Sequence, residues 1–295
     1  MNPKPATGRS ASASYLHGFA RIVTGLLFFQ HGAEKLWGFA GGRTDHNFGT
    51  LRGVAGPLEV VGGTLIALGL FTRFWAFILC GEMAVAYFRS WAPRGFFPIQ
   101  NGGEEAVLFS YIYLWLVTAG AGAWSLDRLI EENRSSKTGT IKTWIASWEG
   151  YDRSILRIIF AFTFCLHGIR LAFGLFPTLA GRRFGNPMAL DLLPRFLGYW
   201  EIAGGCLLLV GLWTRPVAIA SSLVALGAYI YAAAPRGFWP IRNGGNEVLL
   251  YALAFACLAA YGAGGWSMDQ IIGTLRLRHR TEAETAKSAT LLGSQ

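Results

Sequence analysis

The sequence predicts an all-α membrane protein with eight transmembrane helices, arranged as two parallel four-helix bundles. Three observations lead to this prediction. Of the 295 residues, 53% are hydrophobic and only 15% are charged, whereas a soluble domain carries about 25% charged residues. The apolar residues are gathered into segments of about 20 residues, the length that a helix needs to cross a bilayer. The second half of the chain also repeats the motifs of the first half in the same order.

The eight predicted spans follow one another in chain order. They lie at 15–37, 53–72, 74–88, 106–126, 158–177, 196–214, 216–235 and 248–268. The first span is the most polar of the set, and the fourth, seventh and eighth carry no charge. A single acidic residue interrupts three others, namely Glu59 in the second span, Glu82 in the third and Glu201 in the sixth. Such long apolar runs with so few charges are typical of membrane-spanning helices.

The two halves of the chain are copies of one module. Motifs recur at a constant spacing, namely Gly-Leu-x-Thr-Arg at 69–73 and 211–215, Ala-Pro-Arg-Gly-Phe at 92–96 and 234–238, Asn-Gly-Gly at 101–103 and 243–245, and Trp-Ser-x-Asp at 124–127 and 266–269. At the same spacing, Glu59 and Glu105 match Glu201 and Glu247. Because each copy has an even number of spans, both copies enter the membrane from the same side, which makes the repeat parallel.

The repeat predicts four regions. They are a first four-helix module at 15–127, a charged cytoplasmic linker at 128–152, a second four-helix module at 153–270 and a basic, flexible tail at 271–295. Lysine and arginine collect in the linker and the tails, which places both termini in the cytoplasm. The membrane that we expect is the bacterial inner membrane. The bilayer is the expected partner. The net charge of +9 does not indicate nucleic-acid binding, since no basic cluster alternates with exposed aromatic residues.

Ionisable residues inside the predicted spans indicate a functional site, because burying charge in a membrane is costly. His31 and Lys35 are four residues apart and share one helix face. We predict His31 and Glu59 as catalytic residues, with His31 as the proton carrier and Glu59 as the acceptor that orients it. The ligand-binding residues are then Lys35, Arg94, Asn101 and Glu105. A buried hydrogen-bonded network that only locks the helices together explains His31, Lys35 and Glu59 equally well.

The second copy keeps only part of this set. Its counterparts are His167, Glu201, Arg236, Asn243 and Glu247. It carries Arg170 and Leu171 where the first copy has Glu34 and Lys35, and Asn246 where the first has Glu104. Glu82 aligns with Val224. If a single copy is active, we therefore expect it to be the first.

Other motif residues are predicted to be structural. Two inner-face ion pairs, Arg73 with Asp127 and Arg215 with Asp269, are expected to tie the turn between the second and third spans to the end of the fourth. The glycine pairs at 62–63 and 204–205 should allow close helix approach. Each cysteine stands alone in an apolar run, so we expect packing roles, with no dithiol pair and no metal site.

These motifs resemble the DoxX family of four-helix membrane proteins. The resemblance is carried by His-Gly-x-x-Lys at 31–35, Glu59 with Gly-Gly, Gly-Leu-x-Thr-Arg, Asn-Gly-Gly-Glu-Glu and Trp-Ser-Leu-Asp. Proteins of that family include a subunit of a thiosulfate:quinone oxidoreductase, and others are linked to membrane-bound redox or thiol-stress complexes.

The resemblance implies a redox-linked subunit that handles a quinone or a similar lipophilic ligand and works with a redox enzyme subunit. No haem, flavin or metal signature is visible in the sequence, and we expect no covalently bound cofactor. The alternative is a non-catalytic membrane protein, either a scaffold or assembly factor or a small-solute carrier.

Overall fold

The computed structural model describes residues 11–132, 148, 150–175 and 192–292, and these ranges form helices and turns without a strand. The long helices of the first copy are α1 (Ala11–Trp37), α2 (Leu51–Leu68), α3 (Thr72–Ala86) and α5 (Glu104–Ala119). Their counterparts are α8 (Tyr151–Phe173), α9 (Leu192–Val210), α10 (Thr214–Ala228) and α12 (Asn246–Tyr261). Within the described ranges, four segments are long and apolar enough to cross a membrane, namely Leu51–Leu68, Tyr151–Phe173, Leu192–Val210 and Thr214–Arg236. The described part of the chain is therefore all-helical, and its long apolar helices are those of a membrane protein.

The duplication extends to the irregular segments. In each copy, a π-helical turn and a 3-10 turn follow the third long helix, and a four-residue helix precedes the last. These segments are η2 (Tyr87–Trp91), η3 (Ala92–Arg94) and α4 (Pro98–Asn101) in the first copy, and η4 (Tyr229–Ala233), η5 (Ala234–Arg236) and α11 (Pro240–Asn243) in the second. Phe71 and Trp213 both adopt a left-handed conformation with φ of 50°. The two halves thus share backbone detail as well as motifs.

Glycine residues bring the first two helices of each copy into close contact, as predicted. A methyl group on Gly63 would lie 2.8 Å from the carbonyl oxygen of Gly25 in α1. On Gly205 it would lie 2.4 Å from Sγ of Cys165 in α8. Atoms cannot approach so closely, so larger residues at either glycine would push the helices apart.

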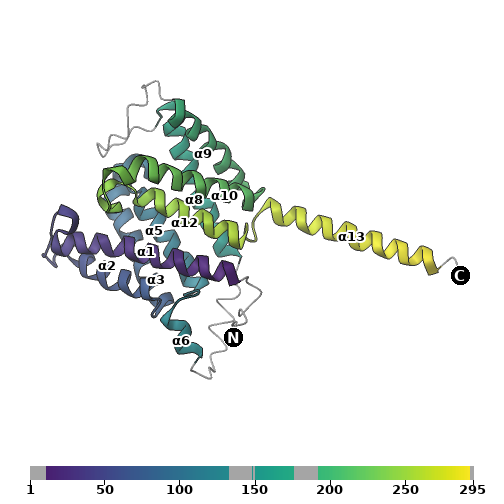
Figure 1. The fold of residues 1–295 in the computed structure, drawn as a ribbon, viewed down its shortest axis with the longest axis horizontal. Helices are drawn as coiled ribbons and strands as arrows, with labels where there is room; N and C mark the ends of the chain where they lie inside the picture. Colours follow the sequence, from purple (N-terminus) through teal and green to yellow (C-terminus); the bar gives the residue numbers. More distant parts are fainter. Residues whose placement is uncertain (1–10, 133–147, 149, 176–191, 293–295) are drawn as a thin grey trace.

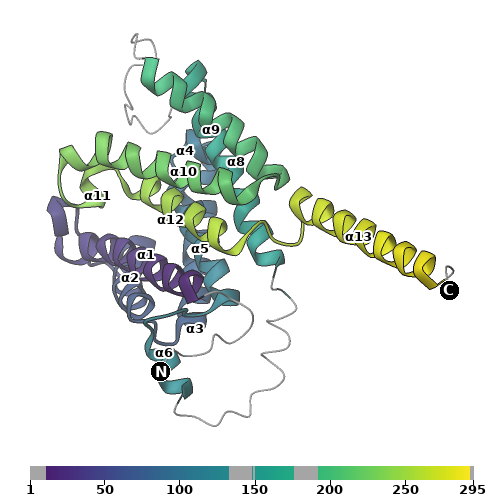
Figure 2. The ribbon, with the colours of Figure 1, turned by 45° about the vertical axis from the view of Figure 1, so that its right-hand side comes forward.

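The two copies pack against each other through their first and last long helices. In the first contact α1 packs against α12, and in the equivalent contact α8 packs against α5. The views in Figure 1 and Figure 2 agree that α2 and α3 lie on one side of this centre and α9 and α10 on the other. An approximate twofold axis between the copies therefore exchanges these two contacts.

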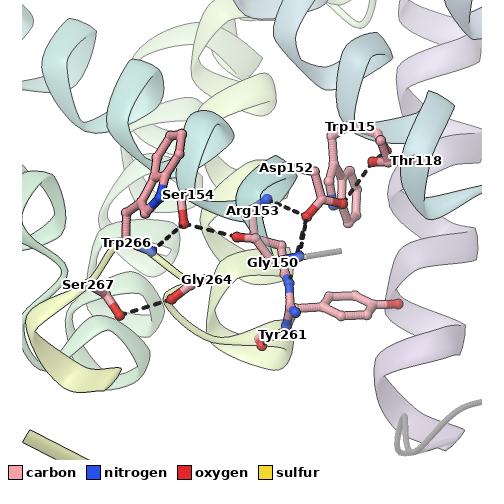
Figure 3. Close-up of polar contacts among 10 residues, drawn as sticks. All are labelled: Trp115, Thr118, Gly150, Asp152, Arg153, Ser154, Tyr261, Gly264, Trp266 and Ser267. Atoms are coloured by element: carbon pink, nitrogen blue, oxygen red, sulfur yellow. Dashed lines mark hydrogen bonds and ion pairs between the residues drawn. The ribbon is translucent and has the colours of Figure 1, made fainter. Parts of the chain in front are cut away.

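One end of the bundle holds the starts of α1 and α8 and the ends of α5 and α12, and we call it the terminal end. The Tyr261 hydroxyl donates to the carbonyl of Ala13 at 3.2 Å. Across the other contact, the Thr118 hydroxyl donates to the Asp152 carboxylate at 2.7 Å, as Figure 3 shows. The opposite end, where α1 finishes and α5 and α12 begin, is called the His31 end.

Two predicted boundaries need correction. The linker was predicted to run to residue 152, but α8 begins at Tyr151, and buried Asp152 belongs to its first turn. Residues 133–147 and 149 of that linker lie outside the described residues. The tail, predicted to be flexible, largely forms α13 (Met268–Leu292), which extends away from the bundle (Figure 1). Its many good helix formers and an ion pair between Arg278 and Glu282, one turn apart, explain the helix.

Candidate functional site

His31 lies near the end of α1 and contacts the start of α5. Its Nε2 atom is 2.9 Å from Oε1 of Glu105, and both side chains are 20% exposed. The imidazole also meets the edge of Phe109, one turn further along α5, with ring centroids 5.8 Å apart. The ring is therefore held between two helices while one face of the pair remains accessible.

Lys35 follows one turn later on the same helix face and forms an ion pair with Glu59 of α2. The Glu59 side chain is 1% exposed and that of Lys35 is 15% exposed. We expected Glu59 to orient His31. In the structure Glu105 contacts His31 instead, because Glu59 is paired with the Lys35 ammonium.

The second copy makes the contact that was expected in the first. Nδ1 of His167 in α8 is 2.7 Å from Oε2 of Glu201 in α9. Leu171 stands where the first copy has Lys35, so no ammonium competes for the carboxylate. Glu247 lies half-buried in the first turn of α12. The two copies thus use equivalent residues in different pairs.

The polar site extends across the boundary between the copies, which the sequence did not predict. Nδ2 of Asn246, at the start of α12, lies 2.9 Å from Nε2 of His31. The Tyr251 hydroxyl, also in α12, donates to Oε1 of Glu104 in α5 at 2.6 Å. Glu104 and Asn246 occupy equivalent positions. The two copies therefore differ at a position close to the approximate twofold axis.

The loop asparagines hold the connection between the third and fourth long helices. Nδ2 of Asn101 donates to the carbonyl of Gly95 at 2.8 Å, and the Gly103 amide donates to Oδ1 of Asn101 at 2.8 Å. Asn243 makes the same pair of bonds in the second copy. Both asparagines are buried. A ligand-binding role for Asn101 stays a prediction, since these bonds are to its own loop.

The two motif arginines lie on the surface of the same loops. Arg94 and Arg236 are both exposed, and Nε of Arg236 donates to the carbonyl of Ala232 at 2.6 Å. Both arginines are close in sequence to residues of the polar site, and their side chains are accessible to solvent. A contact between Arg94 and a ligand remains a prediction.

The connection between α1 and α2 forms a polar rim at the His31 end. Nη2 of Arg52 lies 3.4 Å from Oε1 of Glu34 and donates to the carbonyl of Arg43 at 2.8 Å. In the same loop, hydrogen bonds from the Asn47 amide and then the Thr50 hydroxyl hold the pKa of Asp45 below its ordinary value. The rim is therefore tied together by its own charged groups.

The two predicted inner-face ion pairs are wrong. Asp127 accepts hydrogen bonds from the backbone amides of Phe71 and Thr72 at 2.7 and 2.8 Å, and Asp269 does the same for Trp213 and Thr214. Each carboxylate satisfies amides that a helix start leaves without partners and supports the left-handed residue before it. Arg73 donates to the carbonyls of Val117 and Thr118 at 2.5 and 2.6 Å, and Arg215 is exposed. The turns are tied as expected, but through backbone groups.

A buried arginine in the first helix of each copy was missed. The Arg21 side chain is 1% exposed, and Arg157, its counterpart, is 0% exposed. Arg21 donates to the carbonyls of Ile66 and Ala67 at the end of α2, at 2.5 and 2.6 Å. It also donates to Ala121 and Trp124 beyond α5, at 2.7 and 2.8 Å. The signal was available, since an arginine recurs ten residues before the histidine in both copies.

Two cysteines that are far apart in the sequence lie together in the second copy. Sγ of Cys165 in α8 is 3.9 Å from Sγ of Cys206 in α9. The expectation that each cysteine stands alone is therefore wrong for this pair. The spacing of 41 residues matches no short cysteine motif, so the sequence carried no signal.

Mild oxidation should join Cys165 to Cys206 within one chain, because their sulfur atoms already lie 3.9 Å apart and a disulfide bond spans about 2 Å. We expect copper phenanthroline to remove two of the four thiols of purified protein without forming dimers, measured by maleimide labelling and non-reducing gels. A Cys165→Ala variant should lose no thiol pair. Equal thiol loss in that variant would contradict the packing of α8 on α9.

The described residues contain no group of three or more histidine, cysteine, aspartate or glutamate side chains placed to hold a metal ion. The polar site instead combines single imidazole and ammonium groups with carboxylates. Such a set can donate, accept and transfer protons, and it can stabilise a negative charge on a bound oxygen atom.

Comparison with known proteins supports the repeat. An uncharacterized protein of Haemophilus influenzae is 47% identical over 119 residues, which cover 38% of this chain and 89% of that protein. A second uncharacterized protein of the same organism is 33% identical over 85 residues, which cover 29% of this chain and 56% of that protein. No solved structure matches the chain. The DoxX family model matches residues 17–90 and again residues 153–234. The two matched segments together exceed half of the chain, which therefore belongs to the DoxX family.

Proposed function

We propose that this protein is a redox-linked subunit of the bacterial inner membrane that exchanges protons with a quinone or a similar lipophilic ligand at the His31 end. One observation carries the proposal. Nε2 of His31 lies 2.9 Å from both the Glu105 carboxylate and the Asn246 side-chain amide. When protonated, this nitrogen donates to Glu105, and when neutral it accepts from Asn246. Each protonation state of His31 therefore has a partner of its own.

The membrane arrangement in this proposal has eight spans, formed by the four long helices of each copy, with the copies parallel. Its support is that α1 and α8 start at the terminal end while α5 and α12 finish there. The tail after α12 holds Arg276, Arg278, Arg280 and Lys287. Because cytoplasmic segments are enriched in lysine and arginine, the terminal end faces the cytoplasm. The His31 end then faces the outer side of the inner membrane.

The residues of the His31 end supply polar partners of the kind that a carbonyl-bearing ring would need. A quinone supplies two-electron chemistry when it is bound, and a partner redox subunit supplies the electrons. His31 then carries the proton to and from the ring oxygen. Lys35 stabilises negative charge on that oxygen, with Arg94 approaching from the surface loop, and Glu59 holds Lys35 in place until the ligand arrives.

Removing the imidazole tests this proposal. A His31→Ala variant should bind a short-chain quinone about tenfold more weakly, since a lost hydrogen bond to a charged group is worth about 1.5 kcal/mol or more. Binding is measured by quenching of tryptophan fluorescence in purified protein, with quinone extraction as a second readout. The matched control is His167→Ala, which should retain wild-type binding. Unchanged binding in His31→Ala, together with no extractable quinone, would refute the proposal.

The contact between Tyr251 and Glu104 favours the alternative of a non-catalytic scaffold, because it joins the copies through a buried hydrogen bond. Glu59→Gln separates the two functions. A loss of thermal stability with unchanged quinone binding points to a scaffold or assembly factor. Normal stability with lost binding points to a ligand site, and substrate-dependent uptake into vesicles would identify a small-solute carrier.

A further inference from the structure

Glu82 in α3 places a carboxylate inside the first copy without a visible partner. Both of its oxygen atoms are buried and accept no hydrogen bond. Two neighbours have an unpartnered atom as well, namely Oε2 of Glu59 and the hydroxyl of Tyr113. Glu59 is 1% exposed and Tyr113 is 0% exposed. Buried polar atoms are nearly always hydrogen-bonded, so four such atoms on three neighbouring side chains indicate a bound species.

These groups come from four helices. Gly62 of α2 packs against Leu79 of α3, and this contact lies one turn from Glu59 and one turn from Glu82. The charge of Glu82 acts on those of Glu59 in α2 and Lys35 in α1. Tyr113 in α5 lies within electrostatic range of both carboxylates. His31 also acts on Glu59. The cluster therefore joins the interior of the bundle to the His31 end.

The charges of the cluster do not balance when both carboxylates are ionised. The Lys35 ammonium already pairs with Glu59. An ionised Glu82 would then be a buried negative charge without a cation, which is far more costly than a neutral carboxylic acid at the same place. One added proton restores the balance, because a protonated Glu82 carries no charge.

The second copy shows that these residues form a unit. Glu59 is matched by Glu201, but Lys35, Glu82 and Tyr113 are replaced by apolar residues. Their counterparts are Leu171, Val224 and Phe255. The additional base, the additional acid and the hydroxyl group are thus present together in one copy and absent together from the other. Three independent packing substitutions would have no reason to coincide in this way.

We propose that Glu82 and Glu59 form a buried proton-binding site, in which the two carboxyl groups share one proton beside Lys35 and Tyr113. The proton stays there while Lys35 pairs with Glu59. An anion that draws Lys35 toward the His31 end leaves Glu59 as the stronger base, and the proton then moves from Glu82 to Glu59. The site is independent of the identity of any ligand at His31.

Infrared spectroscopy of the full-length protein in lipid tests this site directly. We expect a C=O stretching band of a protonated, buried carboxyl group at neutral pH, which shifts when water is exchanged for heavy water. Glu82→Gln should abolish the band, and so should Glu82→Val, which introduces the residue that the second copy carries at this position. Glu34→Gln, at the membrane rim, is the matched control and should leave the band unchanged. Retained helicity and a monodisperse elution profile show that each variant is folded.

Three results would overturn the proposal. They are a wild-type spectrum without the band, a band that persists in both Glu82 variants, and a band that sodium or potassium ions remove at constant pH, which would assign the site to a cation. The measurement requires no quinone. A band that behaves as expected in a protein that fails to bind quinone would keep the proton site and reject the proposed function.

Discussion

Replacing Lys35 with leucine should destabilise the protein by about 3 to 5 kcal/mol, the range for breaking a buried ion pair from one side. The reason is the environment of Glu59, which is 1% exposed and would lose the ammonium that pairs with it. Glu82 lies near Glu59 and has no hydrogen-bond partner. Without the Lys35 ammonium, any negative charge on these two buried acids would be left unpaired. The free energy of unfolding in mixed detergent micelles measures the effect.

The double variant Lys35→Leu with Glu82→Val supplies the matched control. It gives the first copy the residues that the second copy already carries, Leu171 and Val224. His31 can then approach Glu59 as His167 approaches Glu201. We expect most of the lost stability to return. A double variant as unstable as the single one would show that Lys35 acts through packing of its alkyl chain rather than through charge.

Replacing Arg21 with leucine should also destabilise the protein strongly, by about 3 kcal/mol or more, since each buried carbonyl left without a donor costs about 1 to 3 kcal/mol. Arg21 satisfies the last carbonyls of α2, Ile66 and Ala67, and those of the segment after α5. A helix end has no other donors for these groups. Thermal unfolding followed by circular dichroism measures the loss.

The chain offers two controls for this prediction. Arg157→Leu removes the equivalent group of the second copy, which donates to Leu208, Leu209 and Trp266, and it should have a similar effect. Arg21→Lys keeps the charge but loses the planar fork that reaches several carbonyls at once, so intermediate stability is expected. Wild-type stability in Arg21→Leu would mean that water satisfies these carbonyls.

The sequence predicted the helices and the repeat well, because apolar runs and recurring motifs are local signals. It also predicted that His31, Lys35 and Glu59 belong to one site. It could not predict which of them pair. Lys35 pairs with Glu59 because their side chains lie close enough between α1 and α2. No spacing in the sequence gives that distance.

The contacts between the copies were out of reach for the same reason. Asn246 lies 215 residues from His31, and Tyr251 lies 147 residues from Glu104. Nothing in a single sequence links positions so far apart. Arg21 and Arg157 are a different case, since their recurrence was visible. A charged residue repeated inside an apolar span is as informative when it is an arginine near the membrane edge as when it is a glutamate.

Glu104 and Asn246 occupy equivalent positions in the two copies but are different residues. This difference has a consequence for how such a protein can diversify. Two identical subunits must present the same residue twice at equivalent places, so an acid beside the symmetry axis always meets its own copy nearby. Joining both modules in one polypeptide removes that constraint. One position can keep the carboxylate that binds Tyr251 while the other becomes an amide that faces His31. A fused chain can therefore give its two halves different residues, and hence different roles, at equivalent positions, whereas a homodimer cannot.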